Sequence, residues 1–258
     1  MKPIILFRND LDSEKEFISC KKYFNVVESR DKIPDNALVI GRYSCVPFYK
    51  ELETLVETKK SKLLVPYSHH KYIASGEYLS DIVDFTPKTF TEANTLPEGS
   101  FIVKGETNSR KHEWKEKMFA PNKKRALEIS KILKEDPLFN NQEIIFREFI
   151  PLENLGYQSS GLPMANEWRI FFYKKEILSY GFYWSESNQI PKDIDKEGLM
   201  FANKVASIIS KKINFYVMDI AKTQNGEWIV IELNDAQQSG LSLNNPDILY
   251  SKLSSILI

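Results

Sequence analysis

The chain has 258 residues, of which 42% are hydrophobic and 27% are charged, a composition typical of a globular protein with one or two domains. Lys plus Arg and Asp plus Glu both number 35, so no overall positive field favours nucleic acid or an anionic membrane as a partner. No run approaches the roughly 20 apolar residues of a membrane helix. No signal-peptide core is seen, and only two cysteines occur, so we expect a cytoplasmic location.

The N-terminal segment alternates short apolar strands with helices, an order that favours a small parallel sheet. The expected strands are 3–7, 25–28, 37–40 and 62–65, and the expected helices are 14–23, capped by Asp12 or Ser13, and 47–59. Polar residues follow the strand ends, where such sheets bind ligands, namely Arg8, Asn9, Arg42, Tyr43 and Ser44. Ordinary loop positions are the plainer interpretation of these residues. The absence of G-x-G-x-x-G argues against a dinucleotide site.

Two adjacent histidines, His69 and His70, lie beyond this segment. The third histidine, His112, is far along the chain and no cysteine accompanies the pair, which argues against a zinc site. A short helix is expected over residues 77–84.

The middle of the chain combines two strands with a polar loop and a helix. Strand 101–105 carries Lys104 near its end, and the polar loop 106–117 follows it. Apolar residues at helical spacing predict an amphipathic helix over 122–134, and a second apolar strand spans 143–151.

A further strand, residues 166–173, follows a loop expected over 153–165. Glu167 and Arg169 share one face of this strand, while Trp168, Ile170 and Phe172 share the other. The alternative to a functional site here is an ordinary Glu–Arg pair at a sheet surface. The remaining predicted elements are a turn at 174–176, a return strand at 177–184, and helices at 195–209 and 248–258.

The most informative stretch is residues 215–240. Asn225 and Gly226 favour a tight turn because both tolerate positive φ, so strands 215–221 and 228–234 should form a hairpin.

Three polar residues interrupt the apolar strands of this hairpin. Glu232 and Asn234 are two residues apart and share a face, and Asp219 on the outgoing strand can lie across from them. Two carboxylates and one amide form the oxygen-only set that Mg²⁺ prefers. The alternative is a half-exposed hairpin with solvent-facing polar residues, but a strand this apolar is typical of burial on both faces.

The order Asp219, hairpin, Glu232-x-Asn234 resembles the metal-binding end of the ATP-grasp enzymes, which include D-alanine–D-alanine ligase, biotin carboxylase and the ribosomal-protein glutamate ligases. Residues 86–243 carry the remaining parts of that pattern in the family's order. The resemblance implies ATP and Mg²⁺ as cofactors, with Asp219, Glu232 and Asn234 as the metal ligands.

The resemblance also implies roles for the cations. Lys104 would contact the α- and β-phosphates of ATP, and Lys71 lies at about the position of a second phosphate-binding lysine. Arg147 departs from the ligases named above and is similar to a divergent clade described by two arginines and one lysine. Arg147, Arg169 and Lys104 would fill these roles as catalytic residues. Arg169 would hold the transferred phosphate, because its planar fork matches phosphate oxygens.

Other predicted contacts follow from the same resemblance. The predicted nucleotide-binding residues beside these cations are Glu148, Phe149, Ile150 and Glu167, with the adenine edge meeting the backbone at 149 or 150. Loop 106–117 replaces a Gly-rich phosphate loop, and its cations are Arg110, Lys111 and His112, beside Thr107, Asn108 and Ser109. A solvated charged loop is the alternative. Gln237, Gln238 and Ser239 would face substrate.

The implied fold is of the α+β/α/β class: an ATP-grasp fold of two α+β subdomains that clasp ATP, preceded by a small Rossmann-like α/β domain. We expect the preceding domain at 1–85, the small subdomain at 86–150, and the large subdomain with the metal site at 151–258.

The implied activity is ATP- and Mg²⁺-dependent ligation, in which a carboxylate is activated as an acyl-phosphate and an amine displaces the phosphate. The substrates would be small molecules, peptides or proteins. A kinase of the same fold and a catalytically degenerate nucleotide- or protein-binding module are the alternatives. A role on nucleic acid lacks the basic domain it would need.

Overall fold

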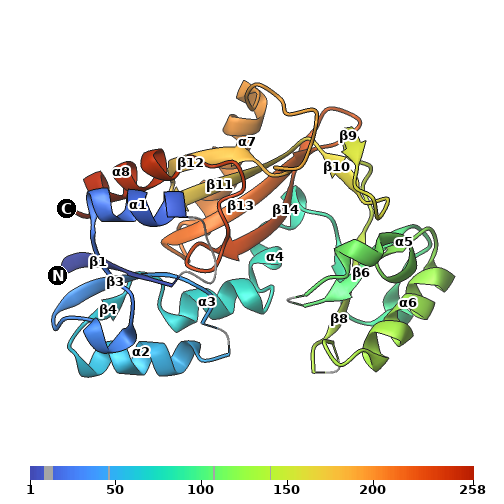
Figure 1. Ribbon diagram of the computed structural model, residues 1–258. Helices are drawn as coiled ribbons and strands as arrows, with labels where there is room; N and C mark the ends of the chain where they lie inside the picture. Colours follow the sequence, from blue (N-terminus) through green and yellow to red (C-terminus); the bar gives the residue numbers. More distant parts are fainter. Residues whose placement is uncertain (9–13, 46, 107, 140) are drawn as a thin grey trace.

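The structure is a computed structural model that describes residues 1–8, 14–45, 47–106, 108–139 and 141–258. Three four-stranded sheets and one two-stranded sheet organise these residues (Figure 1). Asn9, Asp12, Ser13 and Thr107, which the sequence pattern singled out, lie outside the described residues. In the described part of the chain, no helix has both the length and the apolar character needed to cross a membrane.

The N-terminal sheet is parallel throughout, with the strand order β2-β1-β3-β4, and this confirms the predicted parallel sheet. Its strands are β1 (Lys2–Phe7), β2 (Asn25–Val27), β3 (Ala37–Arg42) and β4 (Lys62–Leu63). Its connections are α1 (Glu14–Tyr23), a 3₁₀ turn (Arg30–Lys32) and α2 (Tyr49–Thr58). Tyr49, Leu52 and Val56 form the buried stripe of α2. The helical spacing predicted Leu52 and Val56 there, together with Leu55, which is half-buried, and Phe48, which is exposed.

Two helices follow this sheet, α3 (Tyr67–Ala74) and α4 (Tyr78–Asp81), and a 3₁₀ turn covers Val83–Phe85. The single helix expected over 77–84 is therefore wrong in extent. Ile82 leaves helical geometry, with φ −123° and ψ 28°, and its side chain is fully buried in the core.

The middle sheet is antiparallel, with the order β5-β8-β6-β7. Its strands are β5 (Thr89–Phe90), β6 (Phe101–Gly105), β7 (Phe119–Ala120) and β8 (Ile144–Glu148). Between β5 and β7 the chain also forms 3₁₀ turns at Ala93–Thr95 and Lys111–Glu113 and the short helix α5 (Trp114–Lys117). The predicted amphipathic helix is α6 (Lys123–Glu135), capped by the Asn122 side chain, and its buried stripe packs on this sheet.

The third sheet is antiparallel, with the order β12-β11-β13-β14. Its strands are β11 (Glu167–Tyr173), β12 (Glu176–Phe182), β13 (Phe215–Lys222) and β14 (Trp228–Asp235). The predicted hairpin is thus confirmed. α7 (Lys196–Ile209) covers one face, capped by Asp195, which accepts a hydrogen bond from the Gly198 amide.

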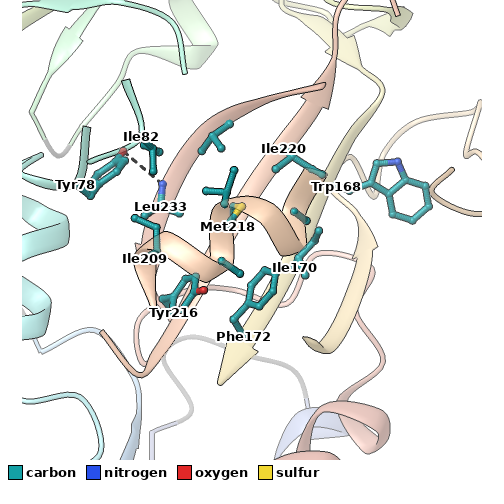
Figure 2. Packing of buried hydrophobic residues seen from close by; sticks show 14 of the residues in the cluster. Tyr78, Ile82, Trp168, Ile170, Phe172, Ile209, Tyr216, Met218, Ile220 and Leu233 are labelled. Atoms are coloured by element: carbon teal, nitrogen blue, oxygen red, sulfur yellow. Dashed lines mark hydrogen bonds between the residues drawn. The ribbon is translucent and has the colours of Figure 1, made fainter. Parts of the chain in front are cut away.

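Figure 2 shows the core on that face. Trp168, Ile170 and Phe172 point into it from β11, as their alternation predicted, and Tyr216, Met218 and Ile220 join them from β13. The Tyr78 hydroxyl accepts a hydrogen bond of 3.4 Å from the Leu233 amide at the edge strand.

The opposite face of the third sheet shares a core with the N-terminal sheet. Ile5 and Phe7 from β1 pack with Phe171 and Val217, and Leu249 from α8 (Pro246–Leu257) completes the cluster. In Figure 1, α8 lies beside α1 next to both sheets, so the two ends of the chain meet.

A small two-stranded sheet occupies the stretch that was expected to be a loop over 153–165. β9 (Asn154–Tyr157) pairs antiparallel with β10 (Pro163–Ala165). Gly156 adopts φ 149°, which side-chain-bearing residues rarely adopt, and the Asn154 side chain accepts its amide hydrogen at 2.9 Å. Polar composition and two glycines hid this hairpin from the sequence pattern.

Candidate active site

The three predicted metal ligands lie together on the third sheet. Asp219 of β13 is the register partner of Glu232 of β14, and a bulge follows Asp219. The Asn234 amide nitrogen lies 3.2 Å from Glu232 Oε1 and 3.4 Å from Asp219 Oδ2. The structure therefore brings the predicted set together on one wall.

Arg169 pairs with this wall from the neighbouring strand. β11 and β13 place Arg169 opposite Asp219, and the guanidinium donates two hydrogen bonds of 2.9 and 2.8 Å to the two carboxylate oxygens. Its Nη1 donates to the Gly240 carbonyl at 2.9 Å, and its face lies 4.9 Å from the Tyr183 ring centre. Burial disfavours the charged guanidinium, but Asp219 outweighs it and raises the pKa of Arg169.

Glu232 meets cations from the middle sheet. Lys104 Nζ of β6 lies 3.6 Å from Glu232 Oε2. Burial acts to raise the pKa of Glu232, but Lys104 and Lys111 lower it to about 2, so this carboxylate stays ionised. Burial is also the largest influence on Lys104 itself and lowers its pKa.

Arg147 of β8 crosses from the middle sheet to the third. Its Nη2 donates to the Thr86 hydroxyl and, at 3.1 Å, to the Val230 carbonyl. Its Nε is buried and has no hydrogen-bond partner among the described residues. One donor of this guanidinium is therefore available to a ligand.

Lys111, from the loop that replaces a Gly-rich segment, reaches the same region. Its ammonium donates to the Tyr183 hydroxyl at 3.0 Å and lies 5.2 Å from the ring centre. Glu167 faces this cluster from β11. Burial, reinforced by the charge of Asp219, raises the pKa of Glu167 to about 8.

A cavity of about 690 Å³ opens between the middle and third sheets. Its far part is largely apolar and aromatic, with Trp114, Met118, Phe119, Trp184 and Ile229 among its lining. Trp184 Nε1 is a buried donor with no hydrogen-bond partner among the described residues. Apolar walls with a few convergent donors are typical of a small-molecule site.

The predicted nucleotide contacts surround this first cavity. Its lining includes Lys104, Arg147, Glu148, Phe149, Ile150, Glu167, Glu232 and Asn234. Asp219, the third member of this wall, is fully buried and turns its carboxylate to Arg169. Lys71 is exposed on α3 and lines neither this cavity nor the second.

A second cavity of about 960 Å³ lies on the other side of the charged wall. The two cavities share Lys104, Asn108, Arg147, Glu232 and Asn234. Arg169, His70 and Asp235 line only the second. Two compartments that meet at one charged wall can hold two reactants on either side of a transferred group.

Residues 237–239, which follow β14, point in two directions: some line the second cavity and one turns to the N-terminal sheet. Gln238 and Ser239 line the cavity, as does Ser44 from the N-terminal segment. Gln237 instead is buried and accepts a hydrogen bond of 3.0 Å from the Gly41 amide. The backbone therefore sends adjacent glutamines in opposite directions.

Several contributors had no sequence signal. Tyr183 and Trp184 follow β12, in a position where aromatic residues are equally typical of a core. The His70–Asp235 contact joins residues that are distant in sequence, and no local pattern predicts it.

The chemistry of the wall fits a hard cation. Two carboxylates and an amide present oxygen ligands, and Lys104 and Arg169 already supply positive charge to the carboxylates. Within the described ranges, no group of three or more His, Cys, Asp or Glu is placed to hold a metal ion. A cation here would therefore need oxygens from a second ligand, as Mg²⁺ commonly takes from phosphates.

Comparison with known proteins supports the same picture. A family model described as "ATP-grasp domain, R2K clade family 3" matches residues 91–253. The D-cycloserine synthetase DcsG has a similar structure, with 12% identity, a TM-score of 0.64 and 100% of each chain covered. No curated protein matches the sequence.

Two further structures carry ligands in their descriptions. The ATP-grasp ligase PsnB, complexed with a minimal precursor, Mg and ADP, is 11% identical with a TM-score of 0.60, covering 98% of this chain and 97% of that one. D-alanine–D-alanine ligase from Bacillus anthracis, complexed with ATP, is 11% identical with a TM-score of 0.57, covering 92% and 86%. At these identities the likeness is one of fold.

Proposed function

The chain belongs to the ATP-grasp domains of R2K clade family 3, and from this premise we propose that it is an ATP- and Mg²⁺-dependent ligase that joins a carboxylate to an amine. The predicted ATP-grasp fold is confirmed by the family match and by the structural likeness. The observation that carries the proposed activity is the charged wall shared by two cavities. Nucleotide would occupy the first cavity and the other substrates the second.

The first cavity suits ATP from end to end. The adenine would lie among the aromatic residues, beside the backbone of Glu148, Phe149 and Ile150. Lys104 and Lys111 would face the phosphates, since both ammonium groups already lie at the polar end. Two buried donors without partners, Arg147 Nε and Trp184 Nε1, belong to residues that line this cavity, which supports an occupant rich in acceptors.

Asp219, Glu232 and Asn234 would hold Mg²⁺. When bound, the metal would neutralise charge on the phosphates and hold them in place. The low pKa of Glu232 keeps this ligand ionised at neutral pH. Asp219 would share its carboxylate between the metal site and Arg169.

The second substrate would react across the wall. A substrate carboxylate oxygen attacks the γ-phosphorus, the bond to the bridging oxygen of ADP breaks, and an acyl-phosphate forms. Arg169 and Arg147 would stabilise the negative charge on the transferred group, and the rigid sheets would position both reactants. An amine then displaces phosphate from the acyl carbon. In this assignment 86–150 and 151–258 enclose the nucleotide, and 1–85 precede them.

Calorimetric binding of the non-hydrolysable analogue AMPPNP tests the proposal. We expect the wild-type protein to bind it more tightly with Mg²⁺ than without, and Glu232→Gln to lose the Mg²⁺-dependent part. Glu227→Gln is the matched control, because Glu227 is exposed beside the turn of the same hairpin and lines neither cavity.

Failure of the wild-type protein to bind AMPPNP would contradict the proposal and favour the degenerate module. With ATP in place of AMPPNP, a stable phosphate ester as the product, instead of an amide, would identify a kinase. Both outcomes leave the fold unchanged.

A further inference from the structure

His70 is held in a defined orientation at the second cavity. Its ring stacks on Tyr49, with centres 4.3 Å apart and planes 20° apart. Its Nδ1 lies 3.2 Å from Asp235 Oδ2 and 3.1 Å from Gln238 Nε2. Tyr67 lies farther off, with ring centres 6.2 Å apart. Of these neighbours only Asp235 carries a charge.

The partners of His70 are themselves fixed. Asp235 is 5% exposed and accepts the Gln237 amide hydrogen at 2.8 Å through its other oxygen. The Tyr49 hydroxyl donates to the Val65 carbonyl at 2.7 Å. Two parts of the fold, the N-terminal segment and the end of β14, thus meet to hold one imidazole ring.

This arrangement leaves one ring nitrogen for a ligand. We assign the ring hydrogen to Nδ1, which donates it to Asp235 Oδ2, while Gln238 Nε2 donates to the same oxygen at 3.2 Å. Nε2 then carries the lone pair, and no hydrogen bond to it occurs among the described residues. A carboxylate on Nδ1 orients the ring and stabilises the imidazolium that forms when Nε2 accepts a proton. A histidine needed only for packing would not require this carboxylate.

The cavity that His70 lines is also the cavity of Arg169, Glu232 and Asn234. Its lining also holds the cations Lys104 and Arg147, but Glu106, Glu143, Glu232 and Asp235 make four carboxylates against three cations, and Glu106 lies beside the like charge of Glu143. This surround favours a positively charged visitor, and an alkylamine arrives at neutral pH as an ammonium ion. Such an amine must lose a proton before its nitrogen can attack.

We propose that His70 is the general base of the ligation step and that the second cavity admits an alkylammonium nucleophile, with Asp235 as the positioning residue behind it. This inference rests on the proposed ligase function. Nε2 of His70 accepts a proton from the nitrogen, and the neutral amine attacks the acyl-phosphate carbon. The C–N bond forms, the C–O bond to phosphate breaks, and inorganic phosphate leaves with the electron pair and takes up the second proton that the attacking nitrogen must lose. The imidazolium then returns its proton to solvent.

The test compares two nucleophiles on the same protein with Mg²⁺ and ATP. The carboxylate source is a mixture of the standard L-amino acids and their D-enantiomers, which also supply alkylammonium groups. Hydroxylamine, present in one arm, is mostly unprotonated at neutral pH and traps the acyl-phosphate as a hydroxamate without needing a base. The readouts are hydroxamate in that arm and amide, identified by mass, in the other.

We expect His70→Gln to form hydroxamate within about twofold of wild type while amide formation falls about 10²–10⁴-fold, the range of general-base catalysis. Retained hydroxamate shows that the variant is folded and that the first half-reaction is intact. His69→Gln is the control, because this neighbouring histidine lines neither cavity, and it should leave both products unchanged.

Asp235→Asn should lower amide formation and spare hydroxamate in the same way. The double variant should be no slower than His70→Gln, because groups that act as a unit are not additive. Equal loss of both products in His70→Gln, or an unchanged amide rate, would overturn the role of His70 alone. Hydroxamate without amide in the wild-type protein would overturn the alkylammonium assignment. Absence of both products would overturn the ligase proposal with it.

Discussion

The third sheet has two neighbours, and it meets them with different kinds of side chain. Toward the N-terminal sheet the contact is a continuous apolar core that includes Phe171 and Val217. The charged group buried there is Arg42, which pairs with Glu16 at 2.8 Å and donates to the carbonyls of Ala236 and Ser239. Apart from these buried polar groups, the contact is apolar.

Toward the middle sheet the contact is polar and encloses the first cavity. Lys104 reaches Glu232 at 3.6 Å, and Lys111 reaches Tyr183 at 3.0 Å. A small apolar cluster around Trp114 is the exception. The difference indicates which contact a ligand would affect. The apolar contact contributes to the stability of the protein without any ligand, whereas the polar contact has excess donors that an anionic ligand would satisfy. Nucleotide binding should therefore stabilise the fold through the polar contact.

Disrupting the apolar contact should have the largest effect on stability. Arg42→Ala leaves the buried Glu16 carboxylate without its cation and two backbone carbonyls without this donor, so we expect the free energy of unfolding to fall by about 3–5 kcal/mol. Urea denaturation measures this. Arg125→Ala is the control, because it removes a solvent-exposed pair with Glu128 on α6 and should cost about 1 kcal/mol or less. Similar losses in the two variants would show that the buried Arg42–Glu16 pair contributes no more to stability than an exposed ion pair.

The next largest effect should be on rate. Arg169→Ala removes the cation that would face the transferred phosphate in the proposed mechanism, and we expect hydroxamate formation to slow about 10²–10³-fold. Because Asp219 loses its partner, folding must be followed separately, and Arg169→Lys keeps a charge for it without the planar fork. A rate near that of wild type in Arg169→Ala would show that the arginine is misplaced in the proposed mechanism.

The polar contact was also the part that the sequence predicted best. The Asn225–Gly226 turn and the period-two alternation are local signals, so the hairpin and its three polar residues could be predicted before the fold was known. The Glu167-x-Arg169 face was predictable for the same reason. That Arg169 binds Asp219 was not, because it depends on the pairing of strands about 50 residues apart.

Two of the predicted site residues, Lys71 and Gln237, line neither cavity, and orientation explains where each one lies. Lys71 was expected at the phosphates, but adjacent residues on a helix point about 100° apart, and α3 turns His70 rather than Lys71 toward the second cavity. Gln237 and Gln238 separate for a similar reason at the end of β14. Which of two neighbours faces a site depends on how its element packs, and this is a tertiary property.

The affinity for a ligand tests the role of the polar contact. Lys111→Met removes one ammonium from the first cavity, and we expect the affinity for AMPPNP with Mg²⁺ to fall about 10- to 100-fold, the usual range for a hydrogen bond to a charged group. Calorimetry measures this. Lys115→Met is the matched control, since Lys115 is exposed on α5 and lines neither of the two cavities. An equal affinity in the two variants would mean that Lys111 serves Tyr183 alone.

The smallest effect should appear as a pH dependence of stability. The pKa of Glu167 is about 8 in the folded protein, against an ordinary 4.5, so the folded state binds the proton more tightly. The stability from this group is complete below pH 4.5 and is lost as pH rises through about 8.

Glu167→Gln cannot ionise and should escape this loss. We expect it to be more stable than wild type by about 1–2 kcal/mol at neutral pH, since one pKa unit corresponds to about 1.4 kcal/mol and relaxation recovers part of the shift. At pH 4.5 the gain should be smaller, because about half of the unfolded wild-type chains then already carry the proton that the folded state binds. Urea denaturation without nucleotide or metal gives the free energy of unfolding at each pH, and so its slope against pH for both proteins. Equal slopes would mean that the cations of the first cavity already satisfy this carboxyl, and that the polar contact needs no ligand to balance it.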